Sequence, residues 1–117
     1  MTRALLFLVL ALPVTATAEV VVVKRVGDVD LSRFDCTPIS ESELLRRVCY
    51  DEPHRYLVAQ IGDEYYDACD VGPKDVDGLM ESEHVVAYYN QHLRVQHKCT
   101  AERGRQARPM SVGRSAR

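Results

Sequence analysis

The sequence has one long apolar run, near its start, and lacks a second. This run, Ala4–Val14, is shorter than the ~18 residues that a membrane-spanning helix needs. Arg3 precedes it, and Ala16-Thr17-Ala18 supplies a small-residue cleavage site before Glu19. We therefore expect residues 1–18 to be a signal peptide that is removed. No cysteine lies directly after the apolar run, so a lipid anchor is not predicted, and the mature chain should contain no membrane span.

Motifs for metal binding and catalysis are also missing. The sequence has no Cys-x-x-Cys pair, which argues against a zinc site, and the acidic residues around Asp63 lack the pattern of a calcium loop. On one helix His84 and His92 would lie ~12 Å apart, too far to share one metal. No Ser/His/Asp set or Cys/His nucleophile is indicated. We therefore predict that the protein is not an enzyme and uses no cofactor or metal.

Charge is distributed unevenly along the chain. Residues 28–99 contain seven Lys or Arg and fifteen Asp or Glu, a net charge of −8, whereas residues 100–117 contain five Arg and one Glu, a net charge of +4. Nucleic acids and anionic membranes bind proteins that neutralise their phosphates. The acidic body therefore disfavours a nucleic-acid partner, and only the Arg-rich end could attract one.

The predicted mature chain has room for one small domain. We expect an N-terminal arm over residues 19–28, a folded domain over residues 29–99 and a disordered tail over residues 100–117, which is poor in apolar residues. Within the arm, Glu19–Val26 is β-branched and fits either a strand or a partly ordered segment. A domain of this size buries a modest core and often needs a covalent staple.

Three short strands joined by two turns are predicted between Leu45 and Val71. Pro53 lies in the first turn, and Gly62-Asp63 forms a two-residue second turn in which glycine supplies the positive φ. The resulting register places an apolar set on one face, which we expect to be the core: Val48, Tyr50, Leu57, Ala59, Ile61, Tyr66 and Ala68. The opposite face would carry Tyr56, Val58 and Asp67 with two cysteines, Cys49 and Cys69.

Four cysteines form an even set: Cys36, Cys49, Cys69 and Cys99. Disulfides are the default interpretation for a chain that we expect to be exported. Cys49 and Cys69 lie on the outer strands of the predicted meander, ~9–10 Å apart, beyond the ~7 Å between Cα atoms that a disulfide allows. Two pairings remain, Cys36–Cys49 with Cys69–Cys99 or Cys36–Cys69 with Cys49–Cys99, and we favour the first.

Two helices are expected after the strands. Gly72-Pro73 opens the first, and Ser82 caps a second that runs to about Gln96. Apolar residues recur at helical spacing in both and should cover the core face of the sheet: Val76, Leu79, Met80, Val85, Tyr88, Tyr89 and Leu93. The predicted fold is therefore α+β, a small antiparallel three-stranded meander covered on one face by two helices, with an extra N-terminal strand as an option.

The order and spacing of several short motifs resemble the KTSC domain, named for the C-terminus of some lysyl-tRNA synthetases and also found as a single domain in bacterial proteins. The resemblance covers roughly residues 42–97, and the Val29-x-Leu31-x-x-Phe34-x-Cys36 run is similar to exported, cysteine-bearing members. The matching positions are Ser42, Val48-Cys49-Tyr50-Asp51, Leu57-Val58-Ala59, Gly62, Tyr66, Val71, Leu79 and Tyr89-Asn90-x-x-Leu93. It implies a three-strand meander followed by two helices and no assigned activity, although RNA binding has been suggested for the family.

Two motifs depart from the family pattern. Its Tyr-x-Tyr falls on Tyr66-Asp67-Ala68, where the second tyrosine is missing, and its Ser-x-Gly falls on His84-Val85-Val86. An asparagine within a helix usually serves a hydrogen bond, so Asn90 is expected to bond Tyr50 or the chain near Asp51. These considerations define one candidate cluster, with a structural role as the first interpretation and ligand binding as the alternative: Tyr50, Asp51, Tyr66, Tyr89 and Asn90.

The sequence therefore predicts a periplasmic or secreted KTSC-like domain that acts as a non-catalytic binding or structural module and is stabilised by disulfides. The partner is unknown, and a protein or envelope component suits the acidic body better than a nucleic acid. Two alternatives remain open, an RNA-binding domain as suggested for the family, and a small metal-binding or enzymatic protein.

Overall fold

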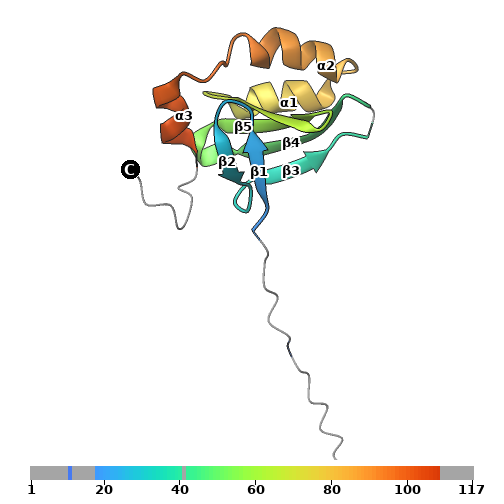
Figure 1. Cartoon of the computed structure of the whole chain (residues 1–117). Helices are drawn as coiled ribbons and strands as arrows, with labels where there is room; N and C mark the ends of the chain where they lie inside the picture. Colours follow the sequence, from blue (N-terminus) through green and yellow to red (C-terminus); the bar gives the residue numbers. More distant parts are fainter. Residues whose placement is uncertain (1–10, 12–17, 41, 109–117) are drawn as a thin grey trace, which may run out of the picture.

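Six strands form one mixed, curled sheet (Figure 1). The computed structural model of the chain describes residues 11, 18–40 and 42–108. The strands are β1 (Val20–Val23), β2 (Gly27–Asp30), β3 (Asp35–Pro38), β4 (Leu45–Asp51), β5 (Tyr56–Ile61) and β6 (Glu64–Ala68). Their order across the sheet is β2-β1-β6-β5-β4-β3, and neighbours are antiparallel except β1 and β6, which are parallel.

The predicted three-stranded meander covered by two helices is wrong. Strands β4, β5 and β6 do pair in the expected register, with Val48 and Tyr66 on either side of Ala59. However, β3 adds beside β4 and the β1–β2 hairpin adds beside β6, and three short α-helices accompany the sheet. The region expected to be an arm thus contains β1 and the start of β2. The predicted signal peptide lies almost wholly outside the described residues.

The physical reason for the larger sheet is that β5 needs cover on both faces. Tyr56, Leu57, Val58 and Ala59 are consecutive, and each is at most 1% exposed. Because successive side chains of a strand point to opposite faces, Leu57 and Ala59 enter one core while Tyr56 and Val58 enter another. The face that sequence analysis left outside the core is therefore buried within the curl of the sheet.

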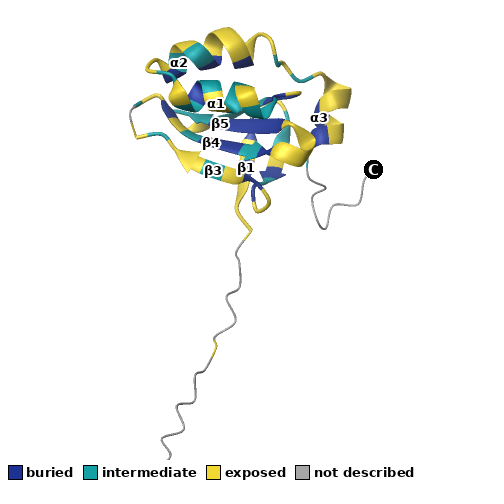
Figure 2. Ribbon diagram, turned by 180° about the vertical axis from the view of Figure 1, so that it is seen from behind, coloured by how far each residue is buried: buried dark blue, intermediate teal, exposed yellow. Residues whose placement is uncertain are grey.

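Helices α1 (Pro73–Glu81) and α2 (Val85–Tyr88) and the π-helical turn η2 (Tyr89–Arg94) cover the first core. Figure 1 shows α1 and α2 side by side above the sheet, and Figure 2 shows a mixture of buried, intermediate and exposed residues on them. The first helix begins where Gly72-Pro73 predicted, and the Gly72 N–H donates to Asp75 Oδ2 at 3.0 Å. The second predicted helix corresponds to α2 and η2 together.

Gly78 allows α1 to approach the helix that follows it. A Cβ atom at this position would lie 2.1 Å from Tyr88 Oη and 2.8 Å from Tyr88 Cζ. Both distances are shorter than a van der Waals contact between such atoms. Gly78 lowers the intrinsic helix propensity of α1, and in exchange it makes room for the Tyr88 ring.

The second core is closed by a helix that the sequence did not predict. Helix α3 (Ala101–Ala107) occupies residues that we expected to belong to a disordered tail, and Ala107 is only 4% exposed. Thr100 caps the helix, since its Oγ1 accepts a hydrogen bond of 3.2 Å from the Arg103 N–H. In Figure 1, α3 lies at one end of the sheet, apart from α1 and α2.

Two disulfides fix the second core. Cys36–Cys49 joins β3 to β4, and Cys69–Cys99 joins the end of β6 to the segment before α3. This is the pairing that we favoured of the two left open by the predicted register. Disulfides indicate an oxidising compartment, and no helix within the described part of the chain is long and apolar enough to cross a membrane.

Candidate functional site

A cleft of about 880 Å³ lies beside β6. Its walls are the turn between β1 and β2, the π-helical turn η2, and the segment that leads from η2 into α3. Its apolar lining comes from several elements: Val26, Leu44, Ile61, Val86 and Val95. The volume falls in the range of ~300–1,000 Å³ that is usual for small-ligand sites. We refer to this feature as the β6 cleft.

Basic side chains dominate the polar lining of the β6 cleft. Five of them converge from distant parts of the chain: Lys24, Arg25, Arg94, Lys98 and Arg108. Lys24 is paired with Glu64 at 2.9 Å, but Arg25, Arg94 and Lys98 form no salt bridge with any residue that the structure describes. Positive charge is therefore concentrated in one cleft of a domain that is acidic overall.

Asp67 is the one carboxylate among the described residues that line the cleft. The Tyr56 hydroxyl donates to Asp67 Oδ2 at 2.8 Å. Burial raises the pKa of Tyr56 above the usual tyrosine value, the neighbouring Asp67 charge raises it further, and Arg108 acts in the opposite direction. Tyr56 therefore stays protonated as a hydrogen-bond donor, and it occupies one oxygen of the only acidic group in the cleft lining.

Two further tyrosines lie at the cleft. Tyr89 is 2% exposed, and burial together with the charge of Asp67 raises its pKa to about 12, against an opposing effect of Arg94. The Tyr66 hydroxyl donates to Glu64 Oε2 at 2.6 Å, and this bond raises the pKa of Tyr66 and lowers that of Glu64. Both phenols are neutral near pH 7 and add hydrogen-bonding groups to a basic surface.

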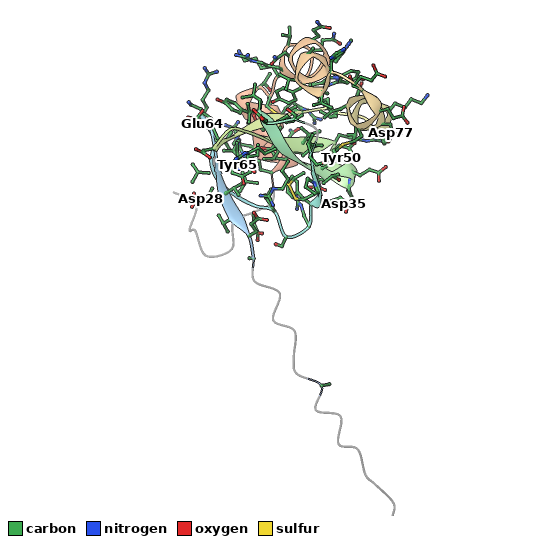
Figure 3. The ribbon with its side chains drawn as sticks, turned by 90° about the vertical axis from the view of Figure 1, so that its right-hand side faces the viewer. Asp28, Asp35, Tyr50, Glu64, Tyr65 and Asp77 are labelled. Carbon is green, nitrogen blue, oxygen red and sulfur yellow. A yellow bond between two sulfur atoms is a disulfide. The ribbon has the colours of Figure 1, made fainter. Side chains whose placement is uncertain are left out.

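The predicted candidate cluster is divided between two places in the structure. Tyr66, Tyr89 and Asn90 line the β6 cleft. Tyr50 does not, because its hydroxyl donates to the Val71 C=O at 2.5 Å; Figure 3 shows Tyr50 on the opposite side of the sheet from Tyr65. Asn90 is exposed, and its side chain forms no hydrogen bond with Tyr50 or with another described residue.

Asp51, the remaining member of the predicted cluster, is 2% exposed, and its contacts are with other side chains of the fold. Its Oδ2 accepts a 2.8 Å hydrogen bond from Arg33 Nε and lies 3.1 Å from His54 Nδ1. Arg33 also donates to the Ala107 C=O at 3.2 Å. Asp51 thus connects the end of β4, through Arg33, to the C-terminal end of α3.

Groups suited to a metal do not come together. No set of three or more His, Cys, Asp or Glu side chains within the described residues is arranged to hold a metal ion. All four cysteines are in disulfides. His97 has local partners, since its Nδ1 lies 3.2 Å from the Cys69 carbonyl oxygen and its Nε2 lies 3.7 Å from Asp75 Oδ2.

Sequence analysis missed the basic residues of the cleft because they are scattered. Arg25 and Arg108 are 83 positions apart in the chain, and both line the cleft only because β1 pairs with β6 and the segment leading into α3 is fixed to the end of β6 by a disulfide. Arg108 was also assigned to a disordered tail. The one local signal was Arg94, which follows the Tyr89-Asn90 motif on the same helical segment.

No family model, curated protein or solved structure matches this chain. The KTSC resemblance therefore stays a prediction, and the β6 cleft is the feature that bears on function.

Proposed function

We propose that this chain is an exported, disulfide-stabilised binding module that holds an anionic ligand in the β6 cleft without transforming it. The observation that supports this is the convergence of Arg25, Arg94 and Lys98 on a cleft of ligand size in an acidic domain. A periplasmic or secreted location is part of the proposal, since the two disulfides suit an oxidising compartment. KTSC membership is retained as a hypothesis.

The chemistry of the lining residues favours binding over catalysis. Guanidinium and ammonium groups donate charge-assisted hydrogen bonds to carboxylates or phosphates, and arginine stays protonated at all ordinary pH values. Tyr89, with a pKa of about 12, can donate a hydrogen bond but is a poor base near neutral pH. Asp67 already accepts the Tyr56 hydroxyl. These groups recognise negative charge more readily than they move protons.

RNA binding remains the alternative, and the same cations could contact phosphates. However, the body outside the cleft is acidic, since residues 28–99 carry a net charge of −8. A polyanion longer than the cleft would extend over this body, and that repulsion offsets the attraction of the basic residues. The acidic body thus favours a ligand whose charge is confined to the cleft.

Thermal unfolding in the presence of anions tests the proposal. Citrate, inorganic phosphate and a short acidic peptide are added to the full chain, and an anion that binds the folded state raises the midpoint temperature. We expect at least one anion to raise the midpoint temperature in a saturable way. The double variant Arg94→Gln/Lys98→Gln should abolish this increase. Lys74→Gln is the control, because it removes a positive charge from an exposed position on α1 outside the cleft. Equal responses of all three proteins would contradict the proposal.

A further inference from the structure

The backbone of β6 has an outer edge whose hydrogen-bonding groups can be assigned. Ile61 and Glu64 flank the two-residue turn between β5 and β6 and are direct partners. In an antiparallel pair, residues alternate between bonding their partner strand and pointing away from it. Tyr65, Asp67 and Cys69 therefore direct their backbone N–H and C=O groups away from β5.

The outward backbone groups of Tyr65 and Cys69 have hydrogen-bond partners, whereas those of Asp67 have none among the described residues. The Tyr65 C=O accepts from the Lys24 N–H, and the Cys69 N–H donates to the His97 C=O, both at 2.8 Å. No described residue forms a backbone hydrogen bond with the outward groups of Asp67. From Tyr65 to Cys69 an extended chain spans ~13 Å. The gap is therefore long enough for about three residues of an added strand.

The gap opens into the β6 cleft, and the cations surround it. Residues 24–26 line the cleft on the β1 side, and residues 98–101 line it on the α3 side. Arg25 and Lys98 thus flank the gap from opposite ends, while Arg94 reaches it from η2 and lies close enough to Tyr66 to affect its pKa. A ligand beside Asp67 therefore lies in a cleft that is lined by cations from three different segments.

From this arrangement we propose that the β6 cleft binds an extended, acidic segment of a partner protein, which adds beside β6 as a short strand. The segment bonds the free backbone groups of Asp67, as in other complexes in which a peptide extends a sheet. Its carboxylates meet Arg94 and Lys98. This inference rests on the proposed function and specifies the class of anion.

A peptide can contact more of the groups that line the cleft than a small anion can. Inorganic phosphate or a small carboxylate would neutralise the cations but would leave the Asp67 backbone unpaired. It would also leave apolar lining uncovered, including Val95, which is 73% exposed. Alternate side chains of an added strand point to opposite faces, so acidic and apolar residues in alternation fit both the charge and the apolar lining.

The test measures binding of labelled peptides to the full, oxidised chain by fluorescence anisotropy. The parent probe is a short peptide of alternating glutamate and valine, and one comparison probe replaces each glutamate with glutamine. A second comparison probe keeps the glutamates but carries N-methyl groups on alternate backbone nitrogens, which blocks strand addition. We expect both comparison probes to bind at least about tenfold more weakly than the parent.

Variants locate the site on the protein. Arg94→Gln/Lys98→Gln should weaken the parent peptide about fivefold or more, since two charge pairs are lost, while Lys74→Gln should leave the affinity unchanged. Affinity should also fall as salt is added. If the cleft variant and the control lose affinity to the same extent, the peptide does not bind in the β6 cleft and the inference is wrong.

Other outcomes separate this inference from the proposed function. If the N-methylated peptide binds as well as the parent, or if single-stranded RNA of matched charge binds more tightly, the strand-addition inference is overturned while anion binding stands. If no peptide, RNA or inorganic phosphate binds and the cleft variant behaves as wild type, both fail. The inference is supported if the unlabelled parent peptide displaces the labelled one and inorganic phosphate does not.

Discussion

Cys69 and Cys99 are joined by a disulfide with their Cα atoms 4.9 Å apart, so the end of β6 is fixed to the segment that leads into α3. The same segment forms one wall of the β6 cleft, and Cys99 itself lines it. The Cys69–His97 backbone bond and the ion pair of Arg103 with Asp70 are other links between the same two parts of the chain. The disulfide is the covalent one among them, so we expect it to contribute to the shape of the cleft.

Removal of this bridge should affect the cleft as well as stability. Cys69→Ser/Cys99→Ser is expected to lower the free energy of unfolding by about 2–4 kcal/mol and to increase hydrogen exchange in α3. Anion binding in the cleft should weaken with it. The matched control is Cys36→Ser/Cys49→Ser, which removes a bridge between β3 and β4, away from the cleft. Denaturant unfolding measures the stability of the two variants, and hydrogen exchange measures the protection of α3. Faster exchange in α3 in both variants would contradict a specific role of Cys69–Cys99 in fixing this segment.

The contact of Gly78 with Tyr88 predicts a strong coupling between two positions. Gly78→Ala should destabilise the fold by about 1–3 kcal/mol, because the new methyl group overlaps the phenol. In a Tyr88→Ala background the overlap is gone, and the same substitution should be neutral or stabilising, since alanine favours a helix by about 1 kcal/mol over glycine. A double-mutant cycle from urea unfolding measures the coupling. Additive effects would show that the helices do not meet at this point.

The second core predicts opposite outcomes for two valines. Val58 is 1% exposed within the curl of the sheet, whereas Val22 on β1 is 67% exposed. Val58→Asp would bury an unpaired carboxylate and should prevent stable folding, or cost at least about 3 kcal/mol. Val22→Asp should change stability by less than about 1 kcal/mol. Circular dichroism during thermal unfolding measures the stability of both variants. Similar stability changes for the two would contradict the burial of Val58 in a second core.

Tyr89 predicts a loss of stability in alkali. Its folded pKa of about 12 exceeds the unfolded value of about 10, so the folded state holds the phenol proton to higher pH. Below about pH 10 the phenol is protonated in both the folded and the unfolded state, so its contribution to stability does not change with pH. Stability should then fall as the pH rises from about 10 through 12, by up to about 3 kcal/mol. Urea unfolding across this range should show a smaller decline for Tyr89→Phe than for wild type. Parallel declines would contradict the raised pKa.

The candidate site was only partly within reach of sequence reasoning. Tyr66, Tyr89 and Asn90 were found because they lie in short motifs, and they do line the cleft. Tyr50 and Asp51 belonged to the same motifs but serve contacts elsewhere. No local pattern places Arg25 and Arg108 in one cleft, because they come from segments that only the tertiary fold brings to the same region.

The local features of this protein follow directly from its amino-acid pattern. The Gly62-Asp63 turn and alternating residues set the register of β4, β5 and β6, and that register excluded a Cys49–Cys69 bridge. The curl of the sheet and the position of α3 depend on tertiary contacts. The reason is that β5 is apolar on both faces, and the choice of what covers the second face depends on contacts between segments far apart in the chain. The β6 cleft lies where two such segments approach the same strand edge.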